Sequence, residues 1–157
     1  MSVFKIGTKF QLVCPEGFRP MTKDERANLR IAEDGDILCL TNEAEHMLVS
    51  IGWKEVNVGV SLLLHLIRPV KSVEASVNRS MSPYGYRLEE MLERQIGGQP
   101  VQGFRYTYTA GGTPMVGESY VLRQGRSLTF FHGYMPQELR ESALALWHGL
   151  LDEVQPL

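Results

Sequence analysis

Three runs of alternating apolar and polar residues in the C-terminal half of the chain constrain the fold more than any other feature. The runs are "GFRYTYT", "PMVGESYVLRQG" and "RSLTFFHGY", which together span residues 103–134. Gly111-Gly112 and Gln124-Gly125 separate them, at places where two-residue hairpin turns belong. Side chains that alternate with a period of two face opposite sides of a sheet. The sequence therefore predicts an antiparallel meander of three strands.

The glycines of the same region also have the spacing of a phosphate-binding loop. Residues 98–103 and 112–117 both read GxxxxG. Such a loop also needs a lysine and a following helix whose free N–H groups face the phosphates. Glu118 follows the second stretch instead, and Pro100 and Pro114 each remove an N–H donor. We expect these glycines to turn strands and not to hold a nucleotide.

The N-terminal third is predicted to contain strands around one short helix. An apolar strand stops at Pro15. "MTKDERANLRIA" follows as a helix, with Thr22 at its N-cap and Glu25 at the capping-box spacing. "GDILCLTNEAEHMLVSIGWKEV" is typical of a β-hairpin that turns at residues 42–45.

Two further segments favour helices. Residues 58–81 are helical in character, and Pro69 is expected to divide them into one helix before it and another from Ser72. A closing helix is expected from about Pro136, because proline suits a first helical turn. Its apolar stripe must be buried against the sheet and consists of Leu139, Ala143, Leu146, Trp147, Leu150, Leu151 and Val154.

The segment "YRLEEMLERQI" at residues 86–96 is ambiguous between strand and helix. Between Leu88 and Gln95 its apolar residues have helical spacing, and its composition favours a helix locally. The glycine turn that follows favours a strand. On a regular strand, Glu89 and Glu90 would point to opposite faces of the sheet.

Composition and charge exclude several classes of function. The 157 residues suit one domain, and a net charge of -2 gives no basic excess that would indicate nucleic-acid binding. No apolar run approaches the ~20 residues of a membrane helix, and no signal peptide is evident. We expect a cytoplasmic protein without membrane insertion. Cys14 and Cys39 are expected to be buried free thiols, with a disulfide as the alternative.

No catalytic or metal-binding constellation stands out in the sequence. The histidines show no HxxxH spacing, and neither cysteine belongs to a CxxC motif. Ser119 lies in "GESYV" and not in a GxSxG elbow. We therefore expect no catalytic, metal or cofactor-binding residues, no cofactor, and a protein that is not an enzyme.

The order of these elements resembles the PsbP-like fold superfamily, including its bacterial DcrB-like branch. The residues that carry the resemblance are "PEGF", "VSIGWK", "IGGQPVQGFRYTY", "MVGESYVLRQGRSLTFFHGY" and "LRESALALWHGLLDEV". It implies an α/β (α+β) fold, with an antiparallel sheet of about six strands between helices on both faces. It also implies one domain over residues 1–157 and favours the strand interpretation of residues 86–96.

Members of this superfamily are mostly not enzymes. They include extrinsic photosystem II subunits, a Ran-binding nuclear import factor, bacterial lipoproteins and Eag-type chaperones, which shield apolar segments of secretion effectors. The resemblance therefore implies a non-catalytic adaptor or chaperone-like protein that binds another protein or an apolar peptide. Because functions differ across one fold, it names no partner.

A partly uncovered sheet offers aromatic side chains to an apolar helix or peptide. The candidate partner-binding residues are Tyr106, Tyr108, Tyr120, Phe130 and His132. Three alternatives stay open: these side chains are covered core, they form a homodimer contact, or the protein is a small-ligand binder or enzyme. For that last alternative, the pocket is expected at the end of the sheet near "MSPYGYR" and His132.

Overall fold

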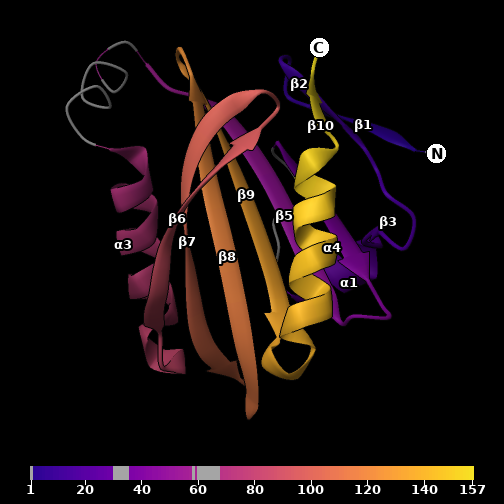
Figure 1. The fold of residues 1–157 in the computed structure, drawn as a ribbon, viewed down its shortest axis with the longest axis vertical. Coiled ribbons are helices and arrows are strands. Elements are labelled where there is room, and N and C mark those ends of the chain that lie inside the picture. The colour runs from indigo at the N-terminus through magenta and orange to yellow at the C-terminus, as the bar shows by residue number, and fades with distance from the viewer. Residues whose placement is uncertain (1, 30–35, 58, 60–67) are drawn as a thin grey trace.

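The computed structural model describes residues 2–29, 36–57, 59 and 68–157. In these ranges the strands form two antiparallel sheets (Figure 1). The larger sheet has seven strands in the order β3-β4-β5-β9-β8-β7-β6. Their bounds are β3 Arg19–Pro20, β4 Ile37–Asn42, β5 Met47–Glu55, β9 Ser127–Pro136, β8 Thr113–Gln124, β7 Gln99–Ala110 and β6 Arg87–Ile96. The smaller sheet, in the order β1-β2-β10, comprises Val3–Ile6, Phe10–Val13 and Val154–Pro156.

Helices cover both faces of the larger sheet, as the resemblance to the PsbP-like fold implied. Helix α3, Pro69–Met81, lies on one side, and α4, Arg140–Asp152, lies on the other (Figure 1). A third helix, α1, spans Lys23–Asn28 and begins with the predicted capping box between Thr22 and Glu25. None of the helices in the described ranges is long and apolar enough to cross a membrane.

The predicted meander is confirmed as β7, β8 and β9, and its register assigns side chains to the two faces. Ser119 of β8 lies opposite Phe104 of β7 and His132 of β9, so these three share the face of α3. The next row, which contains Glu118, faces α4. Each face has its own hydrophobic core: α4 packs over a cluster around Trp147, and α3 packs over one around Tyr106.

Both GxxxxG stretches have a structural explanation. Their first glycines, Gly98 and Gly112, lie in hairpin turns with φ of 77° and 81°, a region that favours glycine. Their last glycines lie within strands, each beneath an aromatic ring. A Cβ on Gly103 would stand 2.3 Å from the ring of Tyr120, and one on Gly117 would stand 2.2 Å from the ring of Tyr106. The GxxxxG spacing is thus explained by a hairpin turn at the first glycine of each stretch and by a close aromatic ring at the last.

The ambiguous segment is a strand, β6, and a β-bulge explains its helix-like pattern. The register on β7 shifts between Leu88 and Glu90, so that Leu88 lies opposite Tyr106 and Met91 lies opposite Phe104. Tyr106 and Phe104 share a face, and therefore Leu88 and Met91 do too, although they are three residues apart. An extra residue in the strand has produced the three-residue spacing of a helix.

Two helix starts differ from the prediction. Helix α3 begins at Pro69 with Arg68 as its N-cap and not at Ser72, because proline fits the first helical position, which needs no N–H donor. The expected helix before Pro69 falls on residues 58–67, most of which lie outside the described residues. Helix α4 begins at Arg140 and not near Pro136, because Pro136 still pairs with β8 and a 3₁₀ turn follows it.

Candidate functional site

A groove lies beside residues 69–77 of α3, between this helix and strands β5 and β9. Its volume is about 450 Å³. The residues that line it are Lys54, Val56, Pro69, Ser72, Val73, Ser76, Val77, Leu128, Phe130 and His132. We call this feature the α3 groove.

Strand pairing and helix periodicity place these side chains. On β9, Leu128, Phe130 and His132 are two residues apart and so project from one face of the sheet. The register of β5 sets Lys54 opposite Leu128 at one end of this row. On α3, serine and valine recur after four residues, which stacks like side chains on the same side of the helix. The groove therefore has an apolar wall with two hydroxyl groups at its helical rim.

A hydrogen bond to the neighbouring strand β8 fixes the orientation of the His132 ring. Its Nδ1 shares a hydrogen bond of 2.7 Å with the Oγ of Ser119, a fully buried residue of β8. The ring also stacks on Tyr134, with 6.2 Å between the ring centres. Burial lowers the pKa of His132 to about 4, so the imidazole is neutral at pH 7. Among the described residues, Ser119 is the one hydrogen-bond partner of His132, which leaves Nε2 available.

Lys54 carries the one formal charge among the described lining residues at neutral pH. Its Nζ lies 5.5 Å from the centre of the Phe130 ring, within the range of a cation–π interaction. The side chain is exposed and pairs with no carboxylate in the described part of the chain. The α3 groove thus has a cation at one end and a neutral imidazole near the other.

Two features of common catalytic sites are missing from the described lining of the α3 groove. The Ser119 hydroxyl beside His132 is fully buried, so a bound molecule cannot reach it as a nucleophile. No carboxylate is among the described lining residues to orient a catalytic base. In the described ranges, no group of three or more His, Cys, Asp or Glu side chains could hold a metal ion.

The five candidate residues do not form one exposed aromatic face. Phe130 and His132 line the α3 groove. Tyr106 and Tyr108 lie on the same face but are buried in the core around α3. Tyr120 is buried on the opposite face, because it stands one strand position after Ser119. All three tyrosines are therefore buried in the core, which is one of the alternatives that the sequence left open.

The residues that the sequence reasoning missed are Lys54, Val56, Leu128 and the α3 residues of the groove. The sequence did contain a pattern that indicates the helical wall of the groove, because "SVEASV" repeats serine-valine after four residues. The contribution of β5 depends on its register with β9, which no local pattern reveals.

The α3 groove is not in the place where a pocket was expected, near "MSPYGYR". The α3 groove contains His132 but lies beside Pro69–Val77, whereas residues 81–87 begin at the C-terminal end of α3. Tyr86 instead packs on Tyr106, with 5.2 Å between the ring centres.

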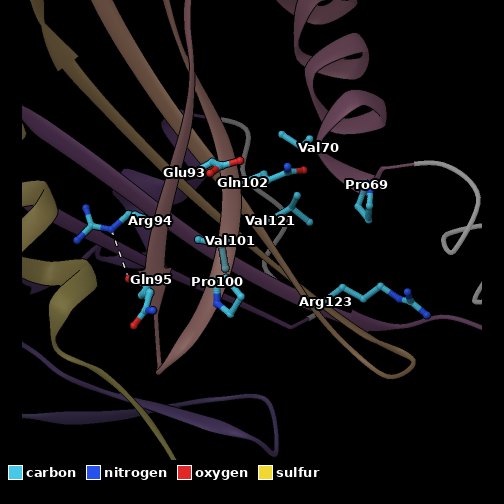
Figure 2. Close-up of a pocket in the computed structure, with 10 residues that line it drawn as sticks. All are labelled: Pro69, Val70, Glu93, Arg94, Gln95, Pro100, Val101, Gln102, Val121 and Arg123. Atoms are coloured by element: carbon cyan, nitrogen blue, oxygen red, sulfur yellow. Dashed lines mark hydrogen bonds between the residues drawn. The ribbon is translucent and has the colours of Figure 1, made fainter.

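A second depression, of about 590 Å³, lies beside the β6–β7 hairpin. Its charged side chains do not converge: Figure 2 shows Arg94 and Arg123 pointing away from each other. Arg94 is also occupied, because its Nη2 donates to Oδ1 of Asp152 at 2.6 Å. This depression lacks a common point where its polar groups could meet a ligand.

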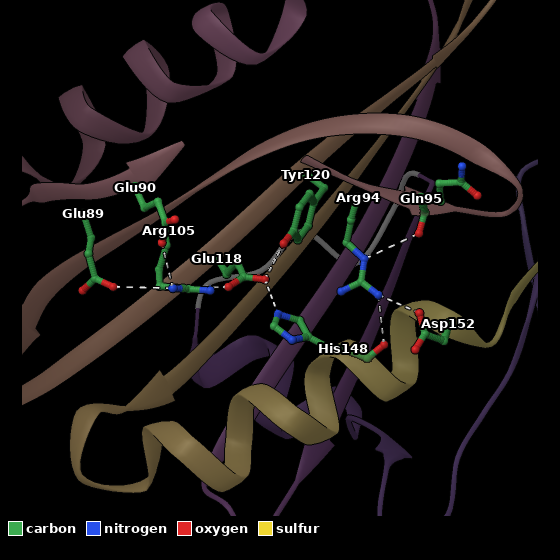
Figure 3. Close-up of polar contacts among 9 residues, drawn as sticks. All are labelled: Glu89, Glu90, Arg94, Gln95, Arg105, Glu118, Tyr120, His148 and Asp152. Atoms are coloured by element: carbon green, nitrogen blue, oxygen red, sulfur yellow. Dashed lines mark hydrogen bonds and ion pairs between the residues drawn. The ribbon is translucent and has the colours of Figure 1, made fainter. Parts of the chain in front are cut away.

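A polar network joins the larger sheet to α4, as Figure 3 shows, and Glu118 lies at its centre. This carboxylate is fully buried and accepts hydrogen bonds from Arg105 Nε at 2.8 Å and from Tyr120 Oη at 2.6 Å. His148 Nε2 of α4 lies 2.7 Å from Oε1 of Glu118, the same oxygen that accepts from Tyr120, whereas Arg105 donates to Oε2. Burial alone would raise the pKa of Glu118, but the bonds to His148, Tyr120 and Arg105 outweigh it and lower the pKa.

The bulge in β6 completes this network. Arg105 Nη1 lies 3.6 Å from Glu89 and 3.3 Å from Glu90, so both carboxylates face the same arginine (Figure 3). The expectation that they point to opposite faces is wrong, because the extra residue in β6 interrupts the alternation. Glu89 also pairs with Arg140 of α4. The network ties β6, β7 and β8 to α4 and is a structural feature, since its central carboxylate is already engaged.

Comparisons with known proteins identify the fold. No family model and no curated protein matches the chain. Among solved structures, the chain is similar to the cyanobacterial PsbP (CyanoP) from Synechocystis sp. PCC 6803, with a TM-score of 0.66 and 11% identity over 99% of this chain and 92% of that one. It is also similar to LpqN, involved in cell envelope biogenesis of Mycobacterium tuberculosis, with a TM-score of 0.56 and 9% identity over 94% and 82% of the two chains.

A third similar structure is protein PA94 from Pseudomonas aeruginosa, described as a protein of unknown function and putative regulator. Its TM-score is 0.56, with 10% identity over 97% of this chain and 94% of that one. At such low identities the likeness shows a PsbP-like fold and nothing about function. It does not single out the DcrB-like branch.

Proposed function

We propose that this protein is a non-catalytic binding protein that holds an apolar segment of another protein chain in the α3 groove. The observation that carries the proposal is the lining of the groove. Val73, Val77 and Phe130 are half-buried and supply an apolar surface at the groove, whereas Val56 and Leu128, which also line it, are buried. An apolar helix or peptide laid into such a groove gains free energy from the surface it removes from water.

The polar groups at the groove suit recognition. The neutral His132 offers one ring nitrogen, and the hydroxyls of Ser72 and Ser76 lie at the rim. A few fixed polar groups in an apolar site orient what binds there. Such a protein would act as an adaptor or a chaperone that shields the apolar segment of its partner. We place this activity in the cytoplasm, where reducing conditions keep Cys14 and Cys39 as free thiols.

Site-specific photo-crosslinking in the native host tests the proposal. A photoreactive phenylalanine analogue at Ser76, on the groove rim, is expected to capture a partner protein. The same analogue at Asn78, exposed on α3 outside the groove, is the matched control. Equal capture at both positions, or capture of a second copy of this chain alone, would contradict the proposal.

The size of the groove favours one alternative function, the binding of a small apolar ligand. A volume of about 450 Å³ is within the range of small-molecule pockets. Native mass spectrometry of protein purified from the host separates the two functions. A bound metabolite without a crosslinked partner would establish the alternative.

A further inference from the structure

We propose that the apolar segment held in the α3 groove carries an acidic side chain at one end, whose carboxylate pairs with Lys54. This inference rests on the proposed function and adds the chemical character of the partner. It follows from the distribution of charge around the groove, which is independent of the groove's apolar lining.

The first step is that Lys54 has no carboxylate partner among the described residues. It is the one ionised side chain among the described lining residues, and it lies over the face of Phe130. No carboxylate in the described part of the chain pairs with it. By contrast, Arg94 and Arg105 of the larger sheet each face a carboxylate. A cation at the mouth of an apolar groove, with no anionic partner among the described residues, is complementary to an anion on the occupant.

The second step is the distance between the two ends of the α3 groove, which are marked by Lys54 and His132. Lys54 lies opposite Leu128, and His132 is four residues further along β9. At about 3.3 Å per residue, the two ends are ~13 Å apart along the strands. Valine, leucine and phenylalanine side chains fill the space between them. The occupant is therefore apolar over about nine helical residues at 1.5 Å each, with its acidic group beyond one end of that stretch.

The third step excludes a positive charge on the occupant at the position that faces Lys54. A lysine or arginine on the occupant would face Lys54 across a partly desolvated mouth, and like charges at an interface oppose binding. The neutral His132 adds no second cation, because burial keeps its pKa at about 4. Charge selection at the groove thus depends on one residue.

Fluorescence anisotropy with three labelled peptides tests the inference. Each is a soluble 18-residue helix with one leucine face, and the three differ only in a Glu, Gln or Lys beyond the end of that face. We expect the Glu peptide to bind about threefold more tightly than the Gln peptide, as suits a partly exposed ion pair. Lys54→Glu should reverse the order and favour the Lys peptide. Lys71→Glu, on α3 outside the groove, is the matched control and should change nothing.

The outcomes separate this inference from the proposed function. If all three peptides bind equally and Lys54→Glu has no effect, while Phe130→Ala weakens every peptide, the charge inference is overturned and the proposed function stands. If no peptide binds but dodecanoate does, the proposed function and this inference are both wrong. Recovery of binding by the Lys peptide on Lys54→Glu would show a direct pair, because a misfolded variant cannot produce it.

Discussion

Gly117 of β8 lies beneath the ring of Tyr106 of β7, so that a Cβ atom on Gly117 would stand 2.2 Å from the Cζ of that tyrosine. Tyr106 is fully buried and cannot move aside without disturbing the core around α3. We expect Gly117→Ala to lower the free energy of unfolding by about 3 kcal/mol, as overpacking of a dense core does. Urea denaturation followed by fluorescence measures it.

Gly149→Ala is the matched control for this substitution. Gly149 lies in α4, and a Cβ there would meet no atom within 4 Å in the described structure. Alanine favours a helix over glycine by about 1 kcal/mol, so this variant should be as stable as the parent or more so. Equal destabilisation by the two substitutions would mean that the ring of Tyr106 is not packed on Gly117.

The pKa of His132 predicts a specific pH dependence of stability. In the folded protein burial lowers this pKa to about 4, whereas an unfolded histidine titrates near its ordinary value of about 6.5. Between these values the unfolded state binds the extra proton. The free energy of unfolding should therefore be highest above about pH 6.5 and should fall as the pH drops toward 4. Urea titrations at several pH values measure this slope.

Replacement of His132 provides the comparison. His132→Gln keeps a hydrogen-bonding side chain beside Ser119 but does not titrate, so its slope between pH 6.5 and 4 should be shallower. NMR of the imidazole carbon protons gives an independent reading. A folded His132 that becomes protonated near pH 6.5 would show that the ring is not desolvated in solution.

The buried carboxylate of Glu118 should be essential for stability. Glu118→Gln retains the shape but removes the negative charge from between Arg105 and His148. Breaking a buried ion pair in this way costs about 3 kcal/mol. Because the folded pKa of Glu118 lies below its ordinary value, its stabilising effect is complete above about pH 4.5 and is lost at lower pH. Thermal unfolding at pH 7 and pH 4 measures both effects.

Glu90→Gln is the matched control for Glu118→Gln. It removes a carboxylate from the same arginine, but its side chain is 58% exposed. Exposed pairs contribute about 0.2–1 kcal/mol, so the loss should be small. If Glu118→Gln were no more harmful than this control, the network would not hold α4 to the sheet.

The two cysteines should be unreactive in the folded protein. Cys14 and Cys39 are buried free thiols, and burial raises the pKa of both. Because the thiolate is the reactive form, a thiol reagent such as dithiobis(nitrobenzoate) should label them slowly before unfolding and rapidly after it. Fast labelling of the native protein, timed by absorbance, would contradict the burial of these side chains.

Local patterns predicted the parts of the fold that depend on neighbours in sequence. The glycine turns and alternating runs gave the meander of β7, β8 and β9, and the capping box gave the start of α1. The ambiguity at Leu88 and Met91 had a physical cause, because a β-bulge imitates helical spacing. Only the pairing of β6 with β7 resolves it.

The candidate site was less predictable because it is built across elements. Phe130 and His132 were found from their strand pattern, but Lys54 joins them through the register of β5 on β9. Tyr120 appeared equivalent to Phe130 by residue type, whereas its strand position sends it to the opposite face. Which aromatic side chains are covered depends on how α3 and α4 pack on the two faces of the sheet, and no pattern within a strand contains that information.

The smaller sheet has a consequence for the order of assembly. Its central strand, β2, pairs with both β1 and β10, so that Gln11 meets Gln155, 144 positions away. Contacts between such distant residues form late, since the intervening chain must first be ordered. During synthesis, one edge of β2 stays open until β10 leaves the ribosome. Strands β1 and β2 are thus made well before β10, but their sheet is completed only when β10 joins it.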